Sequence, residues 1–145
     1  MAGTAMIVVD ASVWVARLVP QDIFHRSTRE WMEARRAENT LFVSPALLLP
    51  EVAGAISRRT HRSDQADQAV VTLQRLPGLR LIEMEHTLVE TASRLASRLG
   101  LRGADAIYVA AADYLNLPLC TLDLEQARRA ADRVLIQTIP VPGQT

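Results

Sequence analysis

Apolar residues along the chain fall into two patterns, short continuous runs and longer stripes at helical spacing. The short runs, rich in Val, Ile and Leu, predict strands at 6–9, 41–43, 79–82, 119–121 and 134–136. The stripes predict helices at about 11–18, 25–37, 45–59, 63–76, 88–99, 103–115 and 124–131. Short apolar strands that alternate with helices require a mostly parallel sheet covered on both faces. We therefore expect an α/β fold with three layers, α/β/α, around a short, mostly parallel central sheet.

The start of the third predicted helix matters for the chemistry. Ser44 followed by Pro45 is a favourable N-cap and first-turn pair, so the third helix is expected to start there and to run to about Arg59. On that boundary Glu51 lies inside the helix. Pro50, directly before it, lacks a backbone donor and is expected to kink the helix that carries Glu51.

Length and composition indicate one domain. The 145 residues are 49% hydrophobic, enough for a single core over 1–145, with a loose leader at 1–5 and a tail at 138–145. The longest apolar runs are interrupted by acids and are too short to span a membrane, and we see no secretory signal. The single cysteine, Cys120, cannot form an internal disulfide and is expected in the core. These features predict a cytoplasmic protein.

The charged residues exclude several functions. The formal net charge is zero, so bulk charge does not hold this protein to nucleic acid, and any such contact must be local. Every basic residue other than the three histidines is arginine. Schiff-base enzymes, phosphate-binding loops of the G-x-x-x-x-G-K type and lysine-dependent phosphotransfer domains all need a lysine, so the sequence excludes them.

Four acids interrupt or end apolar runs. They are Asp10 in MIVVD, Glu51 in PALLLPEVAGAI, Asp105 in GADAIYVAAA and Asp123 in LPLCTLD. An unpaired buried carboxylate costs several kcal/mol, so each needs a cation or hydrogen bonds. The carboxyl ends of parallel strands meet at one crevice, and both Asp10 and Asp123 end strands. A shared hard cation, Mg²⁺ or Mn²⁺, is the most economical compensation for all four.

Each acid also has a structural alternative. Asp10 and Asp123 can be helix N-caps, and Asp105 can be a favourable charge at a helix N-terminus. Glu51, placed inside its helix, has no such task. Taken together, the four acids favour the metal site. Asp113, two turns beyond Asp105, is expected on the surface or in a supporting role.

The segments IVVDASVWVA, LLLPEV, GADAIYVAAA and LCTLDLE, in this order and spacing, resemble the PIN-domain nucleases and among them the VapC-type toxins of bacterial type II toxin–antitoxin pairs. The resemblance implies a Mg²⁺ or Mn²⁺ site made by Asp10, Glu51, Asp105 and Asp123, and hydrolysis of single-stranded or looped RNA. It also implies that the hydroxyls of Ser12 and Thr121 orient the ligands. Local turn bonding is the alternative for these two hydroxyls.

Two sets of arginines are candidates for RNA contacts. One is Arg58, Arg59 and Arg62, with His61, and the other is Arg94, Arg98 and Arg102, spaced four residues apart along one helix face. For each set on its own an ordinary solvated surface is the favoured interpretation, because runs of charge usually do no more than that. Trp14 and Trp31 are the candidates for base stacking.

The resemblance further implies two protein partners. A VapB-type antitoxin would bind the acidic groove with an extended segment, placing an arginine against the carboxylates. A second copy of the chain would pack on the helical pair within 45–76 to form a homodimer.

Three other functions stay open. A PIN ribonuclease that processes RNA without an antitoxin would use the same site. A non-catalytic α/β binding module would use the acids to hold a structural ion or a partner's basic segment. A phosphoacceptor signalling domain also has acids at strand ends, but the absence of lysine disfavours it.

Overall fold

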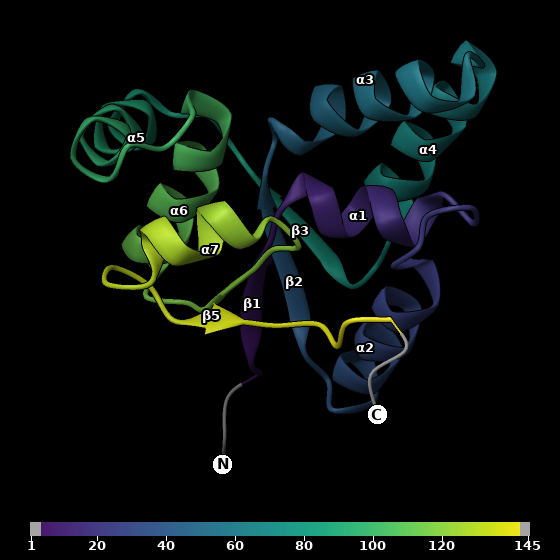
Figure 1. The fold of residues 1–145 in the computed structure, drawn as a ribbon, viewed down its shortest axis with the longest axis horizontal. Helices are drawn as coiled ribbons and strands as arrows, with labels where there is room; N and C mark the ends of the chain where they lie inside the picture. Colours follow the sequence, from purple (N-terminus) through teal and green to yellow (C-terminus); the bar gives the residue numbers. More distant parts are fainter. Residues whose placement is uncertain (1–3, 143–145) are drawn as a thin grey trace.

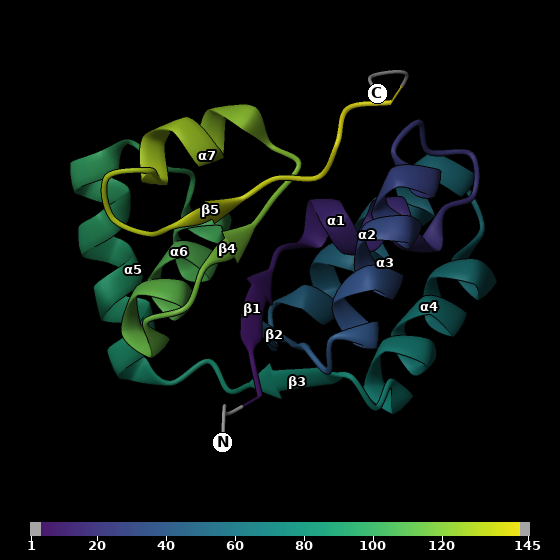
Figure 2. The same ribbon diagram turned by 90° about the horizontal axis from the view of Figure 1, so that it is seen from below.

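A computed structural model describes residues 4–142 and shows one five-stranded sheet between two groups of helices (Figures 1 and 2). The elements are β1 (Met6–Val9), α1 (Ala11–Leu18), α2 (His25–Ala37), β2 (Leu41–Pro45), α3 (Leu48–Thr60), α4 (Ser63–Arg75), β3 (Leu79–Ile82), α5 (His86–Leu99), α6 (Gly103–Leu115), β4 (Leu119–Cys120), α7 (Leu124–Ala130) and β5 (Ile136–Gln137). The strand order is β3-β2-β1-β4-β5 and every pair is parallel. The predicted α/β class and parallel sheet are confirmed.

The two faces of the sheet build two separate cores. Ile7 and Val9 of β1 pack with α1 to α4, whereas Val8 between them packs with α5 to α7. Figure 1 shows these two groups of helices on opposite sides of the sheet. Successive side chains of a strand point to opposite faces, so a strand covered on both sides must be apolar throughout. This is why the strands appear in the sequence as continuous apolar runs.

The start of α3 differs from the prediction. Ser44 and Pro45 belong to β2, where they pair with Leu81 and Ile82 of β3, and the helix begins at Leu48. The Ser44 hydroxyl donates to the Val9 carbonyl at 2.5 Å instead of capping a helix. The N-cap prediction was wrong because pairing with a strand over thirty residues away outweighs a local capping preference.

This shift changes the setting of Glu51. With the helix starting at Leu48, Glu51 lies in its first turn. Pro50 also falls in the first turn, where backbone N–H groups have no partner within the helix, so its missing donor costs nothing. The helix α3 continues without interruption through Pro50. The predicted kink is therefore absent.

Gly100 ends α5 in the left-handed conformation, with φ of 67°. A Cβ atom there would lie 2.5 Å from Nη1 of Arg129. That guanidinium donates to the carbonyls of Gly100 and Leu99 at 3.3 and 3.5 Å. Backbone conformation and the cation at this helix end therefore both require glycine.

Substitution of Gly100 by Ala is expected to lower the free energy of unfolding by about 1–2 kcal/mol, because it adds backbone strain and displaces Arg129. Urea denaturation measures the change. Gly103→Ala is the matched control, since a Cβ there meets nothing within 4 Å. Equal stability of the two variants would contradict this account of the helix end.

Both ends of the chain extend beyond the sheet. Of the predicted leader, residues 1–3 lie outside the described part, while Thr4 and Ala5 are exposed. Of the predicted tail, Ile139 is buried in the core formed with α1 to α4, and residues 143–145 lie outside the described part. Cys120 is buried, as expected. Within residues 4–142, no helix is long and apolar enough to cross a membrane.

A carboxylate cluster at the carboxyl ends of the strands

The four singled-out acids all sit where a chain segment enters a helix. Asp10 and Asp123 are the N-caps of α1 and α7, and Asp105 and Glu51 lie in the first turns of α6 and α3. β1 and β4, which precede α1 and α7, are neighbours at the point where the sheet order reverses. In open parallel sheets, ligands bind at this point, outside the carboxyl ends of the strands.

Asp10 is the most buried of the four, with 3% of its surface exposed. Its Oδ1 accepts a hydrogen bond from the Ser12 hydroxyl at 2.6 Å and its Oδ2 accepts one from the Thr121 hydroxyl at 2.5 Å. Burial raises the pKa of Asp10 to about 6, and the charge of Asp105 adds to this against the lowering effect of the hydrogen bonds. The carboxylate is thus held in one orientation in a place that disfavours its charge.

Ser12 and Thr121 each connect two parts of the site. Ser12 Oγ accepts from the Leu122 N–H at 2.9 Å, and Thr121 Oγ1 accepts from the Asp123 N–H at 3.0 Å. Thr121 also lies 2.9 Å from Oε1 of the buried Gln126. Its single hydrogen can serve either Gln126 or Asp10. Both predicted hydroxyls therefore contact Asp10, and both take part in turn bonding as well.

Asp105 and Asp123 are bridged by an arginine. Arg102 Nε donates to Asp105 Oδ2 at 3.2 Å, and its Nη2 donates to Asp123 Oδ2 at 3.1 Å. Burial raises the pKa of Asp105, Arg102 opposes this, and the charge of Asp123 adds to the increase. These residues line a shallow pocket of about 190 Å³. Unlike Asp10, the two carboxylates are partly open to solvent.

The capping alternative for Asp123 is confirmed, but it engages only one of its oxygens. Oδ1 accepts from the N–H groups of Glu125 and Gln126 at 3.0 and 3.1 Å, as an N-cap does. Oδ2 is left to face Arg102. Asp10 likewise accepts from the Val13 N–H at 3.4 Å while keeping its hydroxyl contacts. Capping therefore fixes these carboxylates without saturating them.

Glu51 approaches the cluster beside Tyr108, a residue that the sequence analysis missed. Glu51 Oε1 and the Tyr108 hydroxyl are both buried and make no hydrogen bond within residues 4–142. Burial raises the pKa of Tyr108, close approach of the Glu51 carboxylate raises it further, and the charges of Asp10 and Asp105 add to this, so the hydroxyl lies next to Glu51. Tyr108 follows Asp105 by three residues in an apolar helix, the one available sequence signal. Gln126 was missed as well.

The donor set suits a hard divalent cation. It consists of carboxylates, with two unpartnered buried oxygens, on Glu51 and Tyr108, beside it. In the part of the chain that the structure describes, no three acids, histidines or cysteines stand close enough to share one ion with the side chains as they are. Arg102 is bound to two of the four acids. The cluster therefore has the right chemistry, and binding of a cation requires its side chains to rearrange.

The two arginine sets lie at different distances from the acids. Arg58 and Arg59 are in the last turn of α3, about two turns from Glu51, and Arg62 is the N-cap of α4. Arg59 is paired with Asp22 and Arg62 with Asp64, each at 2.7 Å. The second set, Arg94, Arg98 and Arg102, runs along α5 into the loop after it, and its last member lies at the carboxylate cluster. Its members Arg94 and Arg98 are exposed, and Arg102 contacts the acids directly.

Three other predicted residues lie away from the site. Trp14 is 2% exposed and packs edge-on against Phe42, so the prediction that it stacks on bases is wrong. Trp31 is half-buried and stacks on the same ring. Asp113 pairs with Arg133 at 3.1 Å at the far end of α6, as expected for a surface acid.

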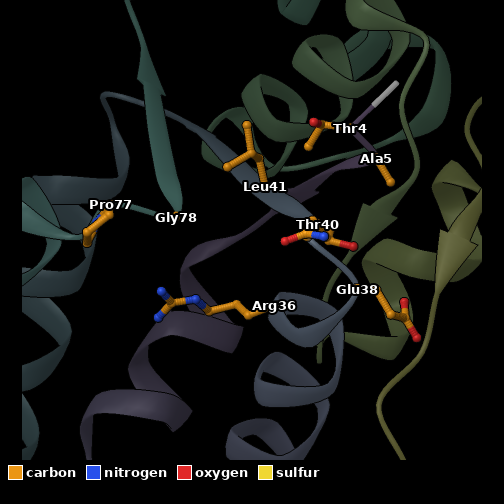
Figure 3. Close-up of a pocket in the computed structure, with 9 residues that line it drawn as sticks. Thr4, Ala5, Arg36, Glu38, Thr40, Leu41, Pro77 and Gly78 are labelled. Carbon is orange, nitrogen blue, oxygen red and sulfur yellow. The ribbon is translucent and has the colours of Figure 1, made fainter. Parts of the chain in front are cut away.

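A larger hollow lies at the opposite end of the sheet. It measures about 700 Å³ and borders the amino ends of β1, β2 and β3 (Figure 3). The Arg36 side chain extends across this hollow toward Pro77 and Gly78. The acid that lines the hollow, Glu38, is paired with Arg35. A hollow with one paired acid does not offer the chemistry of the carboxylate cluster.

Comparison with known proteins gives one family and a set of similar folds. The family described as PIN domain matches residues 7–132. A chain of the Rickettsia felis VapBC2 complex bound to promoter DNA has a TM-score of 0.71 at 14% identity, covering 93% of this chain and 99% of that one. Mycobacterium tuberculosis VapC20, a Sarcin-Ricin loop cleaving toxin, has a TM-score of 0.68 at 19% identity, covering 78% and 86%. FitAcB from Neisseria gonorrhoeae has a TM-score of 0.67 at 18% identity, covering 90% and 96%. The search of curated proteins gave no match.

Proposed function

Because this chain belongs to the PIN-domain family and folds like the VapC and FitB toxins, we propose that it is a metal-dependent endoribonuclease and the toxin of a VapBC-type toxin–antitoxin pair. PIN domains are typically metal-dependent nucleases. The observation that carries the proposal is the buried Asp10 at the sheet's reversal point, linked through Thr121 to the backbone of Asp123, whose carboxylate Arg102 joins to that of Asp105.

In this proposal Asp10, Glu51, Asp105 and Asp123 hold Mg²⁺ or Mn²⁺. Such an ion, when bound, activates water for attack on a phosphodiester and neutralises the charge that develops on its oxygens. Ser12 and Thr121 keep both oxygens of Asp10 in fixed positions, so the rearrangement that the site needs falls on the other carboxylates, two of which must leave Arg102. The Tyr108 hydroxyl offers a donor next to Glu51, in a setting that excludes bulk water.

The helices add a second attraction for a phosphate. The N-termini of α1, α3 and α6, each a helix of eight residues or more, start at the cluster together with the shorter α7. Helix N-termini carry partial positive charge and unpaired N–H groups, which favour anions. An RNA backbone approaching the acids would thus meet a compensating field, reinforced by Arg94, Arg98 and Arg102 on the α5 side.

The substrate and partners follow by likeness to the structural neighbours. One of them is a Sarcin-Ricin loop cleaving toxin, which makes looped, structured RNA the first substrate class to test. Several neighbours come from toxin–antitoxin complexes, so a VapB-type antitoxin is the expected partner. A homodimer built through α3 and α4 and a cytoplasmic location complete the proposal.

The test is cleavage of a pool of structured RNAs by the purified protein with Mn²⁺ and with EDTA. Cleavage is expected with Mn²⁺ alone, and Asp10→Asn is expected to lower the rate by about 100-fold or more, as loss of a group that acts in the transition state does. Asp113→Asn is the matched control, because it makes the same change in an acid remote from the cluster. Metal-independent cutting, or full activity of Asp10→Asn, would overturn the proposed site.

Growth separates the toxin from a PIN ribonuclease that processes RNA without an antitoxin. Induced expression of the wild-type protein is expected to arrest growth, and expression of Asp10→Asn is not. Unaffected growth with an enzyme that cuts RNA in vitro would favour the processing enzyme.

A further inference from the structure

Arg102 makes an unusual contact with the cluster. Its guanidinium donates to Asp105 and to Asp123 at once, at 3.2 and 3.1 Å, although 81% of its side chain is exposed. Within residues 4–142, no other arginine or histidine pairs with any of the four acids. Arg102 is therefore the side-chain cation that pairs with this cluster.

The position of Arg102 in the chain explains why its ion pairs with the two acids can break without disturbing the fold. Arg102 is the N-cap of α6, but its side chain makes no capping hydrogen bond. An exposed ion pair contributes little to stability and is readily exchanged. The neighbouring helix start keeps the residue at the rim of the site whether or not its side chain is bound to the acids.

We propose that Arg102 is an exchangeable counterion, which bridges Asp105 and Asp123 until a divalent cation displaces it and then binds a phosphate of the RNA at the rim of the site. This inference rests on the proposed function, because it takes the same carboxylates as the metal ligands. It adds a residue that works in two steps, first opposing the cation and then positioning the substrate.

Two features of the cluster support the exchange. The carboxylates as they stand do not form a shared metal cage in the described part of the chain, and Asp105 and Asp123 are the two whose oxygens face Arg102. The Tyr108 hydroxyl, 1% exposed, and Glu51 Oε1 stay unpartnered nearby. Beside a cluster of carboxylates, a bound ion or water would satisfy these two oxygens.

The first arm of the test measures cation binding without any cleavage. Calorimetric titration with Mn²⁺ is expected to show about 3- to 10-fold tighter binding to Arg102→Gln than to the wild type, because the competing cation is gone. Arg133→Gln is the matched control: it breaks the exposed pair with Asp113, away from the cluster, and is expected to leave Mn²⁺ affinity unchanged.

The second arm measures RNA binding by fluorescence anisotropy, with a labelled single-stranded oligonucleotide and saturating Ca²⁺, and a gel shows that the probe stays intact. Arg102→Gln is expected to bind about 3- to 10-fold more weakly than the wild type, with a salt-dependence slope smaller by about one. Arg133→Gln is expected to match the wild type. The two effects of Arg102→Gln therefore have opposite signs, which a general loss of structure cannot produce.

The outcomes separate this inference from the function on which it rests. Equal or weaker Mn²⁺ binding by Arg102→Gln, with clear binding by the wild type, would overturn the inference and leave the metal site standing. Unchanged RNA affinity would overturn the second step. A wild-type protein that binds no Mn²⁺ would overturn the proposed metal site and the inference together.

Discussion

Asp10→Asn is expected to stabilise the metal-free protein at neutral pH although it slows RNA cleavage by about 100-fold or more. Asp10 is buried, and burial raises its pKa from 3.8 to about 6. At pH 7.5 the folded protein must therefore carry a charge that its interior disfavours. A shift of about two pKa units corresponds to about 3 kcal/mol, so an uncharged Asn is expected to raise the free energy of unfolding by about 1–3 kcal/mol.

The hydrogen bonds around Asp10 permit this substitution. An Asn amide N–H can donate to Thr121 Oγ1, whose hydrogen then serves Gln126 Oε1 at 2.9 Å. The Asn carbonyl still accepts from Ser12, as Asp10 Oδ1 does. Every heavy polar atom of this network keeps a partner and only the second amide hydrogen of the Asn lacks one, so its cost offsets part of the gain from removing the buried charge.

The pH dependence has a definite sign. Because the folded protein binds the Asp10 proton more tightly than the unfolded chain does, its stability from this group is fully present below pH 4 and falls as the pH rises to about 6. The stability difference between Asp10→Asn and the wild type should grow over that window and level off above pH 7. Urea denaturation in EDTA between pH 4 and 8 measures it.

Asp113→Asn is the control for this comparison, because Asp113 is paired at the surface and its loss changes no buried charge. A constant difference between Asp10→Asn and the wild type from pH 4 to 8 would show that Asp10 is not held at a raised pKa. Destabilisation by Asp10→Asn at pH 7.5 would also show that the pKa of Asp10 is not raised.

The positions of three of the four acids could be predicted from the sequence because the signals for them are local. Asp10 and Asp123 follow apolar strands, and the rule for parallel sheets places such residues at one edge. The order of strands and helices alone predicted that edge. Asp105 was placed equally well, since the apolar run that begins at Gly103 marked the helix start.

The rest of the site depends on contacts between distant segments. Ser44 and Pro45 favour a helix start locally, but pairing with β3 holds them in a strand, and this moved Glu51 from a helix interior to a first turn. Tyr108 was hidden in an apolar helix, where an aromatic residue normally belongs to the core. Arg102 was only a candidate for RNA contact, and its contact with two acids from different elements could be found only in three dimensions.

Mn²⁺ is expected to raise the melting temperature of the wild-type protein by about 10 °C when present at about 100 times its Kd, since a ligand at that excess stabilises the folded state by about 2.7 kcal/mol. The pH dependence should be the reverse of that in EDTA. The cation needs Asp10 ionised, so its stabilising effect must increase as the pH rises through about 6.

Asp105→Asn identifies the carboxylates that produce this effect. Asp105 contributes charge to the surroundings of both Asp10 and Tyr108, so its neutralisation should reduce the Mn²⁺-induced shift to less than half of the wild-type value. Asp113→Asn, on the same helix but paired with Arg133, should retain the full shift. Differential scanning fluorimetry with and without Mn²⁺ measures all three proteins. If Mn²⁺ stabilises Asp105→Asn as much as the wild type, the cation binds elsewhere, because a site shared by these acids cannot lose one of its charges without losing affinity.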